Sequence, residues 1–370
     1  MATVSIKYCA DYDGAAITTA IRDAVDLLGG IGAFVRRGNR VLIKPNLLKA
    51  APPEAAVTTH PEVVRAVIRL VHEAGGSVVV GDSPGIGDFQ RVCEKTGILA
   101  VAREEGAKLA DLSEAVAVKN QGRYQRFEVA KIAAEADVII NLPKFKTHGM
   151  TVLTGAVKNM FGCIPGKRKV QWHFNAGVNH EAFTRMLVEL AGLLQPRLTI
   201  MDAVVGMEGN GPGSGDPRYL GAILAAADPV ALDCIAASLV ELKPEELPVM
   251  IAAAAAGIGD TDLNRISLVG DPLCIVKHFR IPPREHTEWK LPDWMRRTLK
   301  NALTTRPVIN NADCIRCGVC QNHCPQQVIF PRREGLSINY RNCIRCFCCQ
   351  EFCPKGAITV GKGWILKLFR

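Results

Sequence analysis

Two runs of cysteines near the carboxyl end of the sequence have the spacing that iron-sulfur chemistry requires. Nine of the fourteen cysteines fall between positions 314 and 353. One run extends from Cys314 to Cys324 and the other from Cys343 to Cys353, and each follows C-x2-C-x2-C-x3-C-P. Three closely spaced thiolates can hold one face of an iron-sulfur cube while a more distant fourth closes it. Zinc fits this pattern poorly, because four-cysteine zinc sites usually place two pairs on either side of a longer loop.

The repeated run resembles the metal-binding sequence of bacterial two-cluster ferredoxins, in which the fourth cysteine of each run binds the other cluster. The resemblance covers about residues 307–362 and implies two [4Fe-4S] clusters and one-electron transfer. It assigns the ligands to two crossed sets: Cys314, Cys317, Cys320 and Cys353 in one, and Cys343, Cys346, Cys349 and Cys324 in the other. Cys348 also lies in the second run, but only Cys349 keeps both spacings, so we predict a packing role for Cys348.

The composition is that of a globular protein. The 370 residues are 48% hydrophobic, which suffices for two or three domains at the usual ~100 to 200 residues each. The first residues form no apolar segment behind a basic start, and no stretch approaches the ~18 apolar residues of a membrane-spanning helix. We therefore expect a cytoplasmic location, where a metal framework explains clustered cysteines better than disulfides do.

Positive charge is concentrated in the segment that precedes the cysteine runs. Residues 277–306 contain eight Lys or Arg and three acidic residues, within a chain of net charge +9. The prolines predict an extended start, and the later part, DWMRRTLKNAL, predicts a short amphipathic helix. We expect this helix and the closing GWILKLFR to pack on the protein, with peripheral contact to an anionic membrane or an acidic partner as the alternative. Nucleic acid is not an expected partner, because aromatic residues that could stack on bases are sparse.

The first 276 residues alternate short apolar segments with amphipathic helical patterns. Strands are expected at residues 4–9, 40–45, 77–82, 137–143, 197–202 and 221–228. A helix is expected in PEVVRAVIRLVHEAGG, whose apolar residues recur at three- and four-residue steps. The alternation predicts an α/β fold with a doubly wound, largely parallel sheet. The expected organisation is this α/β domain at 1–276, a basic linker at 277–306, a small α+β ferredoxin-like domain at 307–362 and an apolar, basic tail at 363–370.

Polar and charged residues follow most of the expected strands at the point where each strand ends. Ligands of doubly wound sheets bind beyond the carboxyl ends of the strands, so these side chains are predicted to share one rim. The segment NLPKFKTH, after the apolar residues 138–140, is expected to leave the core there and to supply three catalytic residues, Lys144, Lys146 and His148. The expected substrate-binding residues are Lys44, Asn46, Asp82, Lys158, Asn159, Glu208 and Asn210. Gathered lysines repel one another unless they meet acids or an anion, so we predict an anionic small molecule as the ligand.

Several of these residues also have a purely structural interpretation. Asp82 could fix a turn, and Asp228, in ADPVALD, could cap the helix that follows it. The glycine-rich stretch at 206–217 does not match G-x-G-x-x-G, and GCIPGK at 162–167 is one residue short of a phosphate loop. Neither dinucleotide nor triphosphate binding is predicted.

The order of motifs along the α/β part is similar to that of a known family. IKPNLL, TTHPEVV, GDSPG, NLPKFKTHGMTVLTGAVKNMFG, DAVVGMEGNGPGSG and ADPVALD follow one another within about residues 4–270. This order resembles the domain-of-unknown-function 362 family of bacteria and archaea. The resemblance implies frequent fusion to iron-sulfur modules and a redox role, without a specific reaction.

The favoured hypothesis is an iron-sulfur oxidoreductase. An external protein would supply electrons to the clusters, and the clusters would reduce an anionic substrate at the lysine-rich rim. Two alternatives stay open: an electron carrier whose α/β domain only docks a partner, and a non-catalytic sensor or scaffold. A one-electron relay to a closed-shell substrate normally needs a second centre, so an additional unidentified redox cofactor, such as a flavin or a metal, also stays open.

Overall fold

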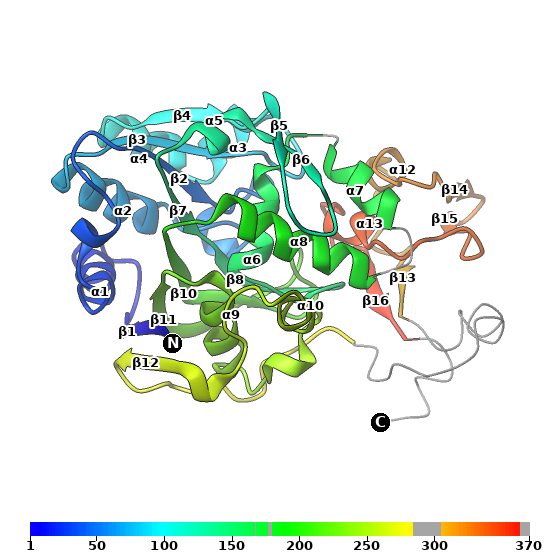
Figure 1. Ribbon diagram of the computed structural model, residues 1–370. Helices are drawn as coiled ribbons and strands as arrows, with labels where there is room; N and C mark the ends of the chain where they lie inside the picture. Colours follow the sequence, from blue (N-terminus) through cyan, green and yellow to red (C-terminus); the bar gives the residue numbers. More distant parts are fainter. Residues whose placement is uncertain (167, 177–179, 284–304, 363–370) are drawn as a thin grey trace.

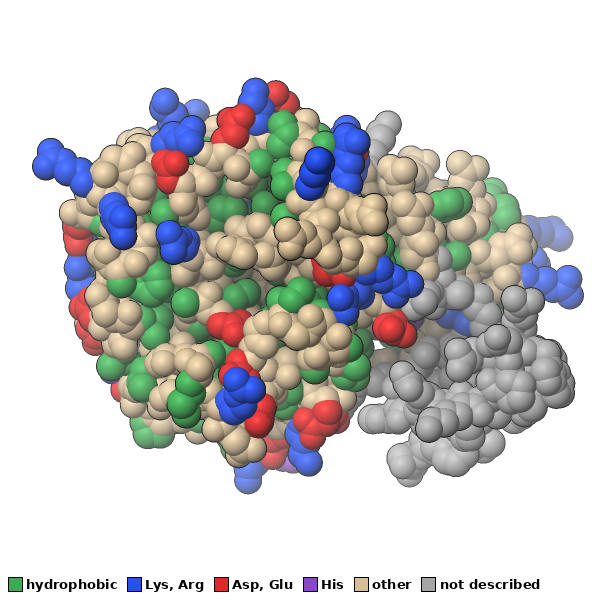
Figure 2. Space-filling model, viewed as in Figure 1, with side chains coloured by type: hydrophobic (Ala, Val, Ile, Leu, Met, Phe, Trp, Pro, Cys, Tyr) green, Lys and Arg blue, Asp and Glu red, His purple; other side chains and the backbone are tan. Residues whose placement is uncertain are grey.

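The computed structural model describes residues 1–166, 168–176, 180–283 and 305–362, which form a large α/β body and a smaller C-terminal module beside it (Figure 1). The amphipathic helix expected at 293–303 and the tail at 363–370 lie outside the described residues. Within the described ranges, no helix is long and apolar enough to cross a membrane. Basic and acidic side chains intermingle on the face of the body shown in Figure 2.

One ten-stranded sheet forms the centre of the body, with its main path in the order β12-β1-β11-β10-β7-β2-β3-β4. The parallel part consists of β2 (Arg40–Pro45), β3 (Ser77–Asp82), β4 (Lys108–Asp111), β7 (Val138–Leu142) and the first half of β10 (Leu198–Glu208). The remaining strands on this path are β11 (Asp216–Ala226), antiparallel to β10 and to β1 (Ala2–Tyr8), and β12 (Ile266–Gly270), parallel to β1. The predicted α/β fold with a largely parallel sheet is confirmed.

Helices cover both faces of the sheet because the inner strands are apolar on both sides. Val41 and Ile43 of β2 belong to one hydrophobic core, and Leu42 between them belongs to the other. The first core is covered by α1 (Gly14–Asp26), α2 (Pro61–Glu73), α3 (Phe89–Lys95) and α4 (Ile98–Glu104). The second is covered by α5 (Lys131–Glu135), α6 (Ala156–Asn159), α8 (His180–Leu194), α9 (Pro229–Ser238), α10 (Pro248–Ala256) and the hairpin of β5 (Ala115–Lys119) and β6 (Arg126–Ala130). Helix α7 (Arg168–Ala176) packs against α8.

Asp228 caps α9, as its position before a proline predicts. Its Oδ1 accepts hydrogen bonds from the backbone N–H groups of Val230 at 2.8 Å and Ala231 at 3.2 Å. Two of the N–H groups that a helix N-terminus leaves without partners are thereby satisfied.

The segment NLPKFKTH does not leave the core, so that prediction is wrong. After Pro143 the chain forms a further strand, β8 (Lys144–His148), which pairs with β10 and with β9 (Val152–Thr154). Its three ionisable side chains are each only 1% exposed. The C-terminal module covers the turn after β8, where a methyl group added at Gly149 would lie 3.1 Å from Val360.

The C-terminal module is a small α+β unit with an internal repeat. Its elements are β13 (Arg306–Ile309), α12 (Val319–Asn322), β14 (Ile329–Arg332), β15 (Gly335–Ile338), α13 (Cys348–Glu351) and β16 (Ile358–Gly361). Strand β13 pairs with β16 and β14 pairs with β15, both antiparallel. The Gln350 side chain donates to the Gly211 carbonyl and to Asn210 Oδ1, both at 2.8 Å. Asn210 in turn donates to the Ile358 carbonyl at 3.1 Å, so α13 and β16 are both fastened to the body.

Candidate functional site

The module contains two cavities, and each is lined by four cysteines. One is lined by Cys314, Cys317, Cys320 and Cys353, and the other by Cys324, Cys343, Cys346 and Cys349. The fourth cysteine of each run therefore lies with the other run, in the crossed arrangement that the ferredoxin resemblance predicts. All fourteen cysteines are free thiols. In the described parts of the chain, no three His, Cys, Asp or Glu side chains are grouped to hold a single metal ion, and the quartets instead surround larger spaces.

The two cysteine loops have the same backbone shape. Arg316 and Arg345, each two residues after the first cysteine of a run, have φ of 54° and 57°. Gly318 and Phe347, each four residues after it, have φ of 76° and 56°. Successive turns of this kind direct backbone N–H groups into a concavity that suits an anionic group, such as a thiolate-ligated cluster.

The protonation of these cysteines couples cluster binding to proton release. Burial raises the pKa of Cys320 to about 11 and holds the pKa of Cys349 well above its usual value. Cys346 differs, because a hydrogen bond from Cys348 lowers its pKa. Cluster iron binds thiolates, so the quartets must lose protons when they take up iron and sulfide. Eight cysteines around two cavities fit two cubanes in number and in chemistry.

A second site lies where the body meets the module. Four lysines of the body, Lys44, Lys146, Lys158 and Lys169, line one pocket together with Cys348 and Glu351 of α13, and we call it the lysine pocket. Six predicted site residues line it: Lys44, Asn46, Asp82, Lys146, Lys158 and Asn159. Four predicted site residues do not: Lys144, His148, Glu208 and Asn210. The pocket therefore brings together residues from the ends of β2 and β3, from β8 and from α6.

Lys44 and Asp82 form a buried ion pair at one wall of this pocket. Lys44 Nζ lies 2.9 Å from Asp82 Oδ1, and the other oxygen of Asp82 accepts the Leu47 N–H at 2.7 Å. Gly162 lies against the pair, and a methyl group there would overlap both side chains. Asp82 is thus the counterion of a pocket lysine.

Lys146 and Lys169 are held by neutral oxygen atoms. Lys146 Nζ donates to Asn46 Oδ1 at 2.8 Å and to the Val57 carbonyl at 2.7 Å. Burial holds the pKa of Lys146 well below its usual value. Burial also lowers the pKa of Lys169 to about 8, and its ammonium donates to the Ser83 carbonyl. An arriving anion would favour the protonated form of both lysines.

Lys158 differs from the other three pocket lysines. It is 8% exposed, and its Nζ lies 5.9 Å from the centre of the Phe161 ring. No described residue forms a hydrogen bond or an ion pair with it. Burial opposes ionisation of Glu351, but the charge of Lys158 and a contact with His148 outweigh it and hold the pKa of Glu351 well below its usual value.

The prediction that Lys144 joins the same site is wrong. Its ammonium lies 2.9 Å from Asp202 Oδ2 and donates to the Tyr12 hydroxyl at 2.8 Å. The Tyr12 hydroxyl donates to Asp202 Oδ1 at 2.7 Å, and the His60 N–H donates to Oδ2 at 2.9 Å. We call these residues the Lys144 network. Its charges are neutralised within the protein, and two of the three N–H groups of the Lys144 ammonium are used there.

His148 does not line the lysine pocket. Its Nδ1 accepts the backbone N–H groups of Met150 at 3.0 Å and Thr151 at 3.3 Å, which places the ring proton on Nε2. Nε2 lies 3.8 Å from Glu351 Oε2, too far for a direct hydrogen bond. Burial lowers the pKa of His148 to about 4, so the ring is neutral near pH 7 and is a weaker proton donor than expected.

Glu208 and Asn210 hold other parts of the chain in place. Glu208 Oε1 accepts from Arg280 Nε at 2.8 Å, at the start of the basic linker. Asn210 bonds to the module, as described above. The prediction that these two residues bind substrate is wrong, because their side chains are used by the linker and the module.

Thr154, Lys169 and His173 also line the pocket but are not among the predicted site residues. Lys169 carried a usable signal, since it lies in the basic stretch GKRKV. Thr154 and His173 carried none, because a single threonine or histidine is common in any buried segment.

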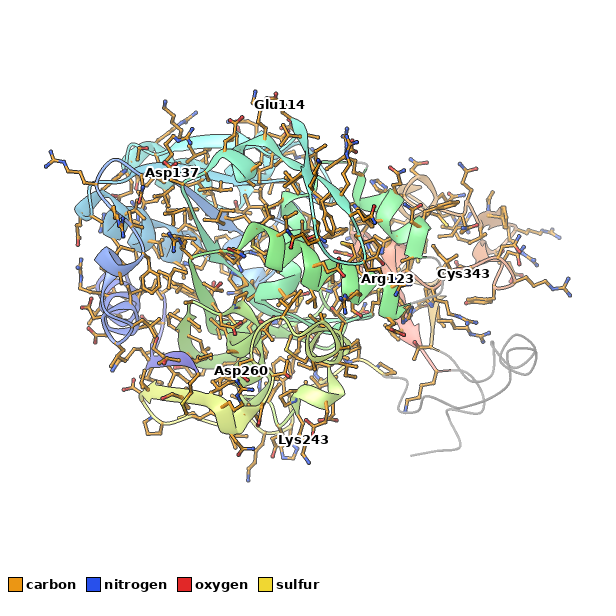
Figure 3. The ribbon with its side chains drawn as sticks, viewed as in Figure 1. Glu114, Arg123, Asp137, Lys243, Asp260 and Cys343 are labelled. Atoms are coloured by element: carbon orange, nitrogen blue, oxygen red, sulfur yellow. The ribbon has the colours of Figure 1, made fainter. Side chains whose placement is uncertain are left out.

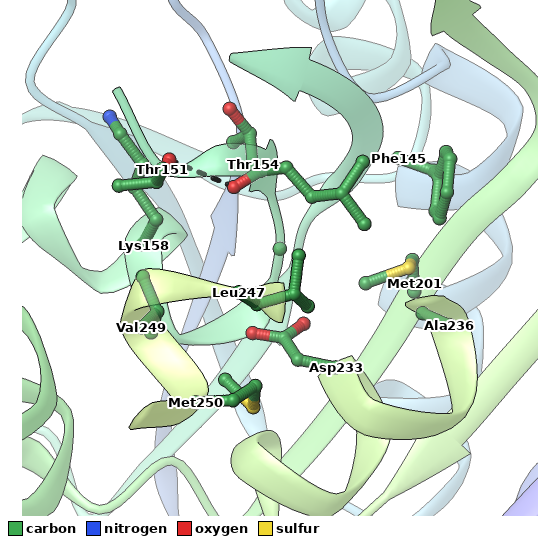
Figure 4. A pocket seen from close by; sticks show the side chains of 12 residues that line it. Phe145, Thr151, Thr154, Lys158, Met201, Asp233, Ala236, Leu247, Val249 and Met250 are labelled. Carbon is green, nitrogen blue, oxygen red and sulfur yellow. Dashed lines mark hydrogen bonds between the residues drawn. The ribbon is translucent and has the colours of Figure 1, made fainter. Parts of the chain in front are cut away.

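A mainly apolar pocket adjoins the lysine pocket and shares Thr154 and Lys158 with it (Figure 4). Asp233 lies in it and accepts the N–H groups of Ala156 at 2.6 Å and Val157 at 3.0 Å. Burial raises the pKa of Asp233 to about 7, against these two hydrogen bonds. Asp233 thereby fixes the start of α6, the helix that carries Lys158.

Comparison with known proteins gives two family matches. The 4Fe-4S dicluster domain matches residues 306–354, so this part of the chain is an iron-sulfur module. The domain of unknown function DUF362 matches residues 41–238.

Two individual proteins are also similar to the chain. A thylakoid-associated protein of Synechocystis sp. is 36% identical over 301 residues, which are 81% of this chain and 94% of the relative. The lactate racemase apoprotein of Thermoanaerobacterium thermosaccharolyticum superposes with a TM-score of 0.44 at 12% identity, over 65% of this chain and 57% of that one. The family model covers more than half of the 370 residues, so the chain belongs to the DUF362 family and carries an iron-sulfur module at its carboxyl end.

Proposed function

We propose that the protein is an iron-sulfur oxidoreductase in which two [4Fe-4S] clusters deliver electrons to an anionic substrate in the lysine pocket. The observation that carries the proposal is the shared wall between the two sites. Helix α13 supplies Cys349 to one cysteine quartet and Cys348 and Glu351 to the lysine pocket. A cluster in that quartet would lie one short helix from the substrate.

When bound, each cluster supplies one electron per cycle of reduction and oxidation. An external carrier protein must supply the electrons, and two of them with two protons complete a two-electron reduction of the substrate. The residues of the chain hold the anion and exclude water around it. Lys146 and Lys169 are suited to pass protons from water, because burial brings their pKa values down toward the working pH.

The first experiment counts the clusters. Anaerobically prepared protein should contain about eight iron and eight sulfide, and dithionite should bleach its visible absorption. Cys353→Ser should lose the cluster of Cys314, Cys317 and Cys320, far away in sequence. Cys348→Ala should keep the full iron content, as a residue outside both quartets. Four iron atoms in the wild-type protein would contradict the assignment.

The second experiment tests electron delivery. Reduced protein is mixed under argon with nitrite, sulfite or pyruvate, and the return of cluster absorption is followed. We expect at least one of these anions to reoxidise the clusters, and Lys158→Met to slow that reaction. Reoxidation by a carrier protein alone, at a rate that Lys158→Met leaves unchanged, would favour the electron carrier instead.

We further propose a cytoplasmic location. The alternative is peripheral contact with a membrane, which the name of the thylakoid-associated relative supports. Co-sedimentation with vesicles that contain about one third anionic lipid tests it. Binding that disappears above physiological salt, where the Debye length falls below ~8 Å, would support electrostatic contact. If the same amount of protein pellets with and without vesicles, membrane contact is ruled out and the cytoplasmic location stands.

A further inference from the structure

We infer that the lysine pocket contains a built subsite for one compact oxyanion, formed by Lys158, Thr154 and His173. The inference deepens the proposed function and rests on it for the claim that this anion is the electron acceptor. Binding of the anion is measured separately from its reduction.

Three polar groups that line the pocket lack a partner among the described residues. Thr154 Oγ1 and His173 Nδ1 are buried and have no hydrogen-bond partner there. The Lys158 ammonium forms no hydrogen bond or ion pair with the described chain either. Leaving buried donors unpaired is costly, so two of them in the same pocket as an unpaired ammonium indicate a missing ligand.

The other pocket lysines differ from Lys158. Lys44 is paired with Asp82, Lys146 is bonded to Asn46 and Val57, and Lys169 donates to Ser83. These three lysines shape the pocket and make it positive, and each directs at least one N–H group at a protein oxygen atom. Lys158 directs none at a described residue, so all three of its N–H groups are available to a ligand.

The three groups share a common chemistry. A lysine ammonium and a threonine hydroxyl both donate hydrogen bonds, and a neutral histidine donates from Nδ1 in one of its two tautomers. Burial lowers the pKa of His173 to about 3, so its ring is neutral at pH 7. The ring is also fixed in orientation, because it stacks on Phe183 with centres 4.2 Å apart. Three donors that line one pocket match a ligand that only accepts, such as a carboxylate or an inorganic oxyanion.

The pocket is small, with a cavity volume of about 70 Å³. Phe161 and Phe352 close parts of the wall with apolar surface. The pocket therefore suits a compact anion better than a nucleotide or a flavin.

The test is calorimetric titration of the full-length, cluster-loaded protein with three probes. Sulfate represents inorganic oxyanions, oxalate represents carboxylates, and AMP is an oversized anion. We expect sulfate or oxalate to bind and AMP not to bind. Tighter binding of sulfate would indicate an inorganic oxyanion as the ligand, and tighter binding of oxalate would indicate a carboxylate. No binding of either small anion would overturn the inference, as would AMP binding as tightly as they do.

The variants assign the binding to the three donors. Lys158→Met should weaken binding about tenfold or more, because it removes a charged donor, and Thr154→Val should weaken it several-fold. The matched controls are Lys243→Met and Thr199→Val. Lys243 is exposed at an edge of the body away from the module (Figure 3). Thr199 is also a buried threonine with an unpartnered hydroxyl, but it does not line the pocket. Equal affinity in Lys158→Met, Thr154→Val and the controls would overturn the assignment.

Failure of the inference and failure of the proposed function can be told apart. Iron content and visible absorption show first that each variant keeps its clusters. If sulfate or oxalate binds through Lys158 but no reducible anion reoxidises the clusters, the subsite stands and the oxidoreductase proposal fails. If nitrite, sulfite or pyruvate reoxidises the clusters equally in wild type and in both variants, the subsite fails and electron delivery stands.

Discussion

Lys144 and Lys146 lie two residues apart on β8 and are both 1% exposed, yet their surroundings differ completely. Lys144 meets a carboxylate, and its charge is cancelled within the fold. Lys146 meets an amide and a carbonyl, and it faces a pocket that holds three further lysines. Burial therefore does not distinguish a structural lysine from a functional one. The partner does, because a buried charge without an opposite charge is costly unless a ligand supplies it.

The contrast with Lys144 is greatest for Lys158. Among the described residues it has not even the neutral partners that Lys146 has, and two further groups without a described partner line the same pocket. The Lys144 network and the lysine pocket thus represent two uses of buried charge in one sheet. Each of the following changes tests that distinction.

The largest effect is expected for Lys144→Met. The change leaves Asp202 buried with one donor fewer and without its opposite charge, which should lower the free energy of unfolding by about 3–5 kcal/mol. Chemical denaturation measures it. The double variant Lys144→Met with Asp202→Asn should recover part of the loss, because it removes the stranded charge. Loss of under about 1 kcal/mol in the single variant would remove the basis for treating the network as structural.

Gly162→Ala should have the next largest effect. The added methyl group would overlap Asp82 and Lys44, so the ion pair at the pocket wall must move. We expect a loss of about 1–3 kcal/mol together with weaker anion binding. The control is Gly32→Ala, where nothing lies within 4 Å of the added atom. Equal stability of the two variants would show that the Lys44 pair is not tightly held.

A pH-dependent effect is expected for Lys169. Burial lowers its folded-state pKa to about 8, so between pH 8 and 10.5 the unfolded chain binds more protons than the folded one. The charges facing it are Asp82, Lys44, Cys163 and Glu351. Stability from this group should therefore rise with pH across that window, by about 2 kcal/mol or less.

Comparison with Lys169→Met isolates this contribution. The variant should gain most over wild type near pH 7.5 and lose that advantage toward pH 10, as measured by urea denaturation. A constant difference at both pH values would mean that the folded state does not perturb the lysine.

The smallest effect on stability is expected for Lys158→Met. No hydrogen bond or ion pair with a described residue is lost, and the methionine retains the apolar stem, but Glu351 loses the positive charge that lowers its pKa, so the free energy of unfolding should fall by about 1 kcal/mol or less. Thermal denaturation at low salt measures it, and Lys144→Met is the matched comparison. Destabilisation comparable to that of Lys144→Met would show that Lys158 has a structural role after all.

Local patterns in the sequence determined much of this protein. The expected strands at 40–45 and 77–82 coincide with β2 and β3, and the expected helix begins at Pro61, as α2 does. These agree because alternation, helical periodicity and capping residues act over a few neighbouring positions. Three ligands of each cysteine quartet lie within one run and are local in the same sense, whereas the crossing of the fourth cysteine was implied by the resemblance to two-cluster ferredoxins.

Only the tertiary structure decided which lysine is paired within the protein and which one faces the pocket without a partner among the described residues. Lys144 finds Asp202 from 58 residues away and Tyr12 from 132 residues away, and no pattern in NLPKFKTH indicates either partner. Lys158, Thr154 and His173 likewise share a pocket because α6 packs on β9 and α8, and α7 also packs on α8. The type and the charge of each residue follow from the sequence. Whether a buried charge is cancelled or left for a ligand depends on contacts between distant segments, which form only when the chain is folded.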